Sequence, residues 1–68
     1  MKVARILPSF RKGLRVFELI AGSGDGLRQA ELARSSGIPA SNLALYLNTL
    51  LAENLVLRDP LSRRYCVH

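Results

Sequence analysis

The chain of 68 residues is long enough for one small domain, which buries only about 60% of the surface that its unfolded chain exposes. Hydrophobic residues make up 49% of the sequence and charged residues 22%, and this balance excludes a disordered chain. The net charge of +5 favours a polyanionic partner, while the single cysteine excludes an internal disulfide and suits a reducing compartment such as the cytoplasm.

The first predicted element is a helix over residues 9–21, with Ser9 as its N-cap. Apolar residues recur in it at positions i, i+4, i+7 and i+11, which is the spacing of one helix face. That face is predicted to turn towards the core and consists of Phe10, Leu14, Phe17 and Ala21. The stretch "GSGDG", residues 22–26, ends the helix because glycines adopt the positive φ values that a helix stop requires.

A second helix is predicted over residues 29–36, after a very short extended piece at residues 27–28. Ala30 and Ala33 are expected on the inner side of this helix. Gly37 closes it, and an Ile-Pro pair then forms the connection to the next helix.

The third helix is predicted over residues 41–54, with Ser41 as its N-cap. The leucines predicted to form its core face are Leu43, Leu47, Leu50 and Leu51. Two short strands within residues 55–67 flank the turn "DPLSR" and indicate a β-hairpin, in which Tyr65 is expected to anchor the hairpin to the core. This order of elements predicts a mostly α (α+β) fold over residues 1–68: a winged helix-turn-helix with three helices and a short β-hairpin wing.

Three residues, Ala33, Gly37 and Leu43, have the spacing of a DNA-binding helix-turn-helix. The small alanine lets two helices approach closely, the glycine adopts the turn conformation, and the leucine anchors the recognition helix in the core. A wider likeness runs through "RKGLRVFELIA", "LRQAELARSSGIPASNLALYLNTLLAENLV" and "RDPLSRRYCV". Together these segments resemble the N-terminal winged helix domain of the IclR family of bacterial transcriptional regulators.

The resemblance implies a homodimer that binds a palindromic operator in double-stranded DNA, with the third helix in the major groove and the wing along the backbone. Members of that family normally continue into a C-terminal effector-binding domain. Because this chain ends at His68, beyond the wing, we expect either an isolated domain or a stand-alone module.

The recognition helix departs from the family pattern. Family members usually offer Lys and Thr around the first turn and Arg one turn later, whereas this chain has Ala40, Asn42 and Leu45 at the matching places. Asn54 stands where a Gly often follows the helix, and it can still take the left-handed conformation. The residues predicted to face the DNA bases are Ser41, Asn42, Ala44, Leu45 and Asn48. Asparagine can pair with adenine, and an apolar side chain can touch a thymine methyl group.

The positive charge is concentrated on the first helix, at the entrance to the second and in the wing. The residues predicted to contact DNA phosphates are Arg11, Arg15, Arg28, Arg58, Arg63 and Arg64. Such contacts position a protein on the duplex without reading its sequence. A solvated basic surface is the alternative interpretation.

No catalytic residue, cofactor or metal site is predicted, because the chain has one histidine and its five carboxylates are scattered. Cys66 and His68 share one face of a strand, but a zinc site usually takes four ligands. The first eight residues lack the apolar run of a signal peptide, and the apolar-rich stretch 43–57 is shorter than the roughly 20 residues of a membrane span. We expect a non-enzymatic cytoplasmic protein without membrane contact.

The sequence thus predicts a sequence-specific DNA-binding domain of a transcriptional regulator. The alternative is a winged helix that serves as a protein-interaction module through Ala44, Leu45 and Asn48, because an uncharged, partly apolar face also suits a protein partner. Nucleic-acid binding without sequence preference is a third hypothesis.

Overall fold

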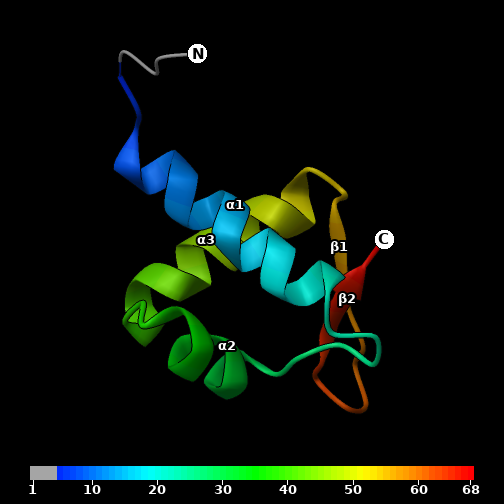
Figure 1. Ribbon diagram of the computed structural model, residues 1–68. Coiled ribbons are helices and arrows are strands. Elements are labelled where there is room, and N and C mark those ends of the chain that lie inside the picture. The colour runs from blue at the N-terminus through cyan, green and yellow to red at the C-terminus, as the bar shows by residue number, and fades with distance from the viewer. Residues whose placement is uncertain (1–4) are drawn as a thin grey trace.

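The computed structural model describes residues 5–68 of the chain, so the first four residues of the expected domain lie outside the described part. Its elements in chain order are α1 Pro8–Ala21, α2 Gln29–Ser36, α3 Ala40–Ala52, β1 Val56–Arg58 and β2 Tyr65–Val67 (Figure 1). Three helices followed by an antiparallel two-stranded hairpin confirm the predicted winged helix-turn-helix.

The core lies where the three helices meet the hairpin. Its buried residues are Val16, Ile20, Leu32, Ile38, Leu43, Leu47, Leu50, Val56 and Tyr65. The predicted core face of α3 is confirmed, with Leu51 packed at its edge. In α2, Leu32 is fully buried and Ala33 packs against the core, but Ala30 is exposed, so the expectation for that alanine was wrong.

The predicted core face of α1 was wrong. Val16 and Ile20 are the buried residues of this helix, whereas the side chains of Phe10 and Leu14 are 65% and 49% exposed. Phe17 is half-buried and Ala21 is exposed. There are two physical reasons. The first half of α1 projects away from α2 and the hairpin (Figure 1), and the face that packs is the one with Val16 and Ile20, about 100° around the helix from the predicted face.

The helix starts also differ from the expected ones. The first helix begins at Pro8, with Leu7 as its N-cap, because proline at the first helical position has a preset φ and no N–H to satisfy. The third begins after Pro39, whose carbonyl accepts the N–H of Leu43 at 2.9 Å. The expected N-caps Ser9 and Ser41 are therefore both inside the helices.

Two residues end helices in the left-handed conformation, as the sequence predicts. Gly37 has φ 73° directly after α2, and its N–H donates to the carbonyl of Ala33 at 2.9 Å. Asn54 has φ 59° after α3. These turns set the angle between α2 and α3 and the direction in which the chain enters the wing.

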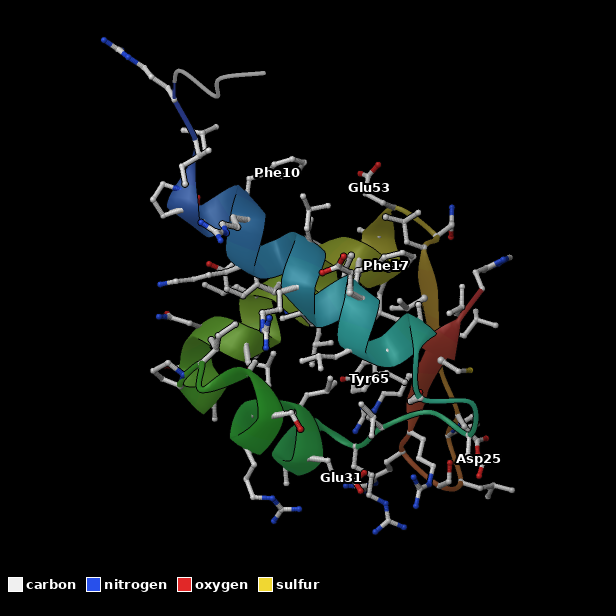
Figure 2. All side chains as sticks on the ribbon, in the orientation of Figure 1. Phe10, Phe17, Asp25, Glu31, Glu53 and Tyr65 are labelled. Carbon is white, nitrogen blue, oxygen red and sulfur yellow. The ribbon has the colours of Figure 1, made fainter. Side chains whose placement is uncertain are left out.

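The hairpin is tied to the helices through Tyr65. β1 and β2 pair with Val56 opposite Val67 and Arg58 opposite Tyr65. The predicted extended piece pairs as well, since the N–H of Leu27 donates to the carbonyl of Tyr65 at 3.0 Å and the reverse bond is 2.7 Å long. The side chain of Tyr65 is buried, which confirms its role as the anchor of the wing (Figure 2). Within residues 5–68, no helix has the length and apolar character needed to cross a membrane.

Candidate nucleic-acid interface

The outward face of α3 is uncharged and open to solvent. Ser41, Leu45 and Asn48 follow one another at helical spacing on one stripe, and all three are exposed. Leu45 is 65% exposed, although it is one of the larger apolar side chains of the domain. Asn42 is exposed at the edge of this stripe, whereas Ala44 is half-buried and offers less of its surface. The hydroxyl of Thr49 donates to the carbonyl of Leu45 at 2.9 Å.

Three arginines gather where α2 begins beside the wing. Arg28, Arg58 and Arg63 are exposed and line one shallow depression, together with Gln29, Leu61 and Ser62. The Nε of Arg28 donates to the carbonyl of Ser62 at 3.1 Å and so links α2 to the wing turn. The guanidinium of Arg58 lies 5.6 Å from the centre of the Tyr65 ring, within the range of a cation–π contact. We call these three arginines the wing cluster.

The wing turn is ordered by Asp59. Its carboxylate accepts the hydroxyl of Ser62 at 2.6 Å and the Ser62 N–H at 3.1 Å. The hydrogen bond from the Ser62 hydroxyl, followed by those from the Ser62 and Leu61 N–H groups, lowers the pKa of Asp59. Arg63 then adopts a left-handed backbone, with φ 63°, and its N–H donates to the carbonyl of Asp59 at 2.8 Å. The turn thereby fixes the backbone that carries Arg63.

Arg64 has a different environment from the wing cluster. It is half-buried, and its Nη1 donates to the carbonyl of Gly26 at 3.1 Å and lies 3.7 Å from the Oε1 of Glu31. Glu31 also accepts the N–H of Arg28 at 2.8 Å at the start of α2, on the side of the wing (Figure 2). That hydrogen bond, and then the charge of Arg64, lower the pKa of Glu31. The guanidinium of Arg64 is thus engaged within the protein.

A second basic surface lies beside the first turn of α3. Arg15 and Lys12 of α1 line a small depression with Asn42 and the turn that joins α2 to α3. Arg11 is exposed on α1 but lines neither of the two basic depressions. Lys12 belongs to the same basic stretch of α1 as Arg11 and Arg15, and its i, i+3 spacing to Arg15 places the two on neighbouring turns of one face.

An apolar groove of about 390 Å³ runs between α1 and the second half of α3. Its lining includes Phe10, Leu14, Phe17, Leu50 and Leu55. In Figure 2 the two phenylalanines and Glu53 lie on the same side of the molecule. The residues predicted as the core face of α1 thus form one wall of this groove.

The described residues contain no gathering of three or more His, Cys, Asp or Glu side chains that would hold a metal ion. The Cys66 thiol is free and half-buried. The exposed surface carries guanidinium and ammonium groups around an uncharged helix. This combination suits a polyanionic partner whose surface depends on its sequence.

Comparison with known proteins agrees with this arrangement. The IclR helix-turn-helix domain matches residues 9–60. A crystal structure of an IclR transcriptional regulator from Alicyclobacillus acidocaldarius superposes with a TM-score of 0.82 at 30% sequence identity, covering 93% of this chain and 26% of that one. A crystal structure of an IclR family transcriptional regulator from Brucella abortus has the same fold, with a TM-score of 0.82 at 22% identity, covering 93% of this chain and 24% of that one. No curated protein sequence matches the chain.

The chain spans about a quarter of the length of either regulator. Within that quarter, the family match takes in all three helices and β1, and the fold agrees over nearly the whole of the chain. The helix-turn-helix, its wing and the basic residues around them agree with this family match. The chain belongs to the IclR helix-turn-helix family, the DNA-binding domains of transcriptional regulators.

Proposed function

We propose that this domain binds double-stranded DNA sequence-specifically, with α3 in the major groove and arginines on the backbone phosphates. The observation that carries the proposal is the wing cluster, in which three exposed guanidinium groups from the N-cap of α2, from β1 and from the wing turn line one depression. Guanidinium groups form charge-assisted hydrogen bonds with phosphate oxygens. The uncharged face of α3 supports a readout of bases through Ser41, Asn42, Leu45 and Asn48, with Ala44 at its margin.

The basic residues proposed to contact phosphates differ in their environments within the domain. Arg28, Arg58 and Arg63 form the principal contact surface, and Arg15 with Lys12 forms a second one beside α3. Arg11 adds to the positive potential of α1. Arg64 supports the wing from within, because its guanidinium already binds Gly26 and Glu31. The domain holds the backbone from two sides and leaves α3 free for the bases.

Changing both Arg58 and Arg63 to glutamine is expected to weaken binding to every duplex and to reduce the slope of log K against log salt by about 1.8, or 0.9 for each lost phosphate contact. Fluorescence anisotropy with a labelled mixed-sequence duplex, titrated at several salt concentrations, measures this slope. The matched control is Arg34→Gln, because Arg34 is exposed on α2 and lines neither basic depression.

An unchanged slope in the double variant would contradict the role of the wing cluster. If the unaltered chain fails to bind duplex DNA even at low salt, DNA binding itself is wrong. The protein-interaction module through Ala44, Leu45 and Asn48 would then be the better explanation of an uncharged, exposed helix face.

We further propose that the domain acts as a homodimer in which the apolar groove beside α1 receives the α1 helix of a second copy. Phe10 and Leu14 have the periodicity of a buried face and yet are exposed, which is expected when the cover belongs to another chain. A two-fold interface uses the same face of both copies. Antiparallel pairing of the two helices about a centre between Leu14 and Arg15 would set Arg11 of one copy opposite Glu18 of the other, so that their charges match.

Phe10→Glu is expected to weaken self-association by at least about tenfold, because it would bury a carboxylate in an apolar contact and place it near Glu18 of the second copy. Sedimentation equilibrium over a range of concentrations measures the effect. Leu61→Glu is the control, since Leu61 is 93% exposed on the wing. A chain that is monomeric at millimolar concentration, or equal losses in the two variants, would refute this interface.

A further inference from the structure

The chemistry of the exposed α3 stripe restricts which base pairs it can read. From residue 40 to residue 52 the helix contains no Lys, Arg, Asp or Glu. Arginine and lysine are the common readers of guanine in the major groove, and carboxylates accept from the amino group of cytosine. The helix therefore lacks the side chains that distinguish G·C pairs most strongly.

Leu45 lies at the centre of the stripe. Ser41 precedes it by four residues and Asn48 follows it by three, so the three side chains are neighbours on the helix surface. At 65% exposure, the leucine presents an apolar surface to whatever α3 docks against. In the major groove, the apolar group at the edge of the bases is the C5 methyl group of thymine. A leucine in this place gains contact area opposite thymine that cytosine does not provide.

The polar neighbours of Leu45 favour the same pair. Asn48 carries an amide that can donate to N7 and accept from the amino group of adenine. The Thr49 hydroxyl is already used within the helix, where it donates to the carbonyl of Leu45. The exposed polar groups next to the leucine are thus the Ser41 hydroxyl and the amides of Asn42 and Asn48, and the amides are the groups with a definite base preference.

We infer that α3 reads A·T pairs at the centre of its half-site, with Leu45 on a thymine methyl group and Asn48 on an adenine of the same or the adjacent pair. This inference rests on the proposed function, because it requires α3 to enter the major groove. It adds the class of DNA that the domain recognises: half-sites defined by A·T pairs and dependent on the C5 methyl group, held by backbone contacts that are indifferent to sequence.

The test begins with selection of bound duplexes from a random-sequence pool by the 68-residue chain. The selected half-site is expected to have A·T pairs at its centre. Thymines in that centre are then replaced by uracil, which removes only the methyl group. Each replaced thymine that Leu45 contacts is expected to weaken binding about fourfold, the effect of removing one methyl group from an apolar contact. Uracil outside the selected centre, as the control, should leave binding unchanged.

Two variants assign the effect to residues. Leu45→Ala should bind the thymine and uracil duplexes equally, and its exposure means that circular dichroism should show an intact fold. Asn48→Ala should keep the sensitivity to uracil and lose the discrimination between adenine and guanine at one position. Uracil sensitivity that persists in Leu45→Ala would remove the leucine from the readout.

The remaining outcomes separate this inference from the function on which it rests. A selected site centred on G·C pairs, or binding that is indifferent to uracil, would overturn the A·T readout and leave DNA binding intact. Binding without any selected sequence would overturn the A·T readout and the sequence specificity of the proposed function, and would leave only binding that is indifferent to sequence. No binding to any duplex at low salt would overturn both.

Discussion

Leu47→Ala is expected to lower the free energy of unfolding by about 2–5 kcal/mol, because it leaves a cavity in the core that the helices cannot close. Leu47 is fully buried between α3 and the rest of the core. A domain of this length has about 3–10 kcal/mol of stability in total, so the variant should lose a large share of it. Urea denaturation followed by circular dichroism measures the change.

The control for this substitution is two residues away on the same helix. Leu45→Ala makes the same chemical change at a side chain that is 65% exposed, and it should alter stability by less than about 0.5 kcal/mol. The pair therefore separates the loss of core packing from the change in helix propensity, which is common to both. Similar losses at the two positions would mean that the outward face of α3 is not free in solution.

Gly26→Ala is expected to cost about 2 kcal/mol or more, because two effects act together. Gly26 has φ +88°, which L-residues with a side chain rarely adopt. A methyl group at this position would lie 2.7 Å from the carbonyl oxygen of Tyr65 and 3.3 Å from the Cβ of Arg64. The first approach is too close, so β2 or the segment before α2 must shift, and we expect this shift to weaken the bonds between Leu27 and Tyr65.

Gly24→Ala isolates the backbone effect. Gly24 has φ +71° in the same loop, but an added methyl group meets no atom within 4 Å, so strain alone of about 1 kcal/mol is expected. Chemical denaturation of both variants gives the difference, and amide hydrogen exchange at Leu27 and Tyr65 shows whether the bridge opens. Equal destabilisation in the two variants would argue against a tight approach at Gly26.

The leucine face of α3 was predictable from sequence because its leucines lie on one face of the helix and the helix is packed along most of its length. In α1 the pattern identified an apolar face, but the face that packs is the one with Val16 and Ile20, about 100° away. Periodicity shows that one face of a helix is apolar. It does not show whether the residues that pack on that face belong to the same chain or to another. The predicted helix starts were wrong for a local reason. Pro8 and Pro39 determine where the helices begin, so that both serines already lie inside a helix and cannot act as caps.

The positions of the candidate site residues on their elements were largely predictable, but their environments were not. The sequence placed the arginines on α1, at the start of α2 and in the wing. It could not show that Arg64 reaches Gly26 across 38 positions of chain and pairs with Glu31, whereas its neighbour Arg63 stays exposed. Such differences depend on the left-handed backbone at Arg63 and on the hairpin register, neither of which has a signature in these residues.

The links between α2 and the wing have a consequence for the cost of binding. Arg28 binds the carbonyl of Ser62, and Arg64 binds that of Gly26, so the wing is held against the start of α2 by side chains on both elements. A loop that is mobile in the free protein loses conformational entropy when a ligand orders it, and this loss is subtracted from the affinity. A wing that is already in place loses little backbone entropy, so the ordering cost that remains for contacts made by its arginines is that of their side chains.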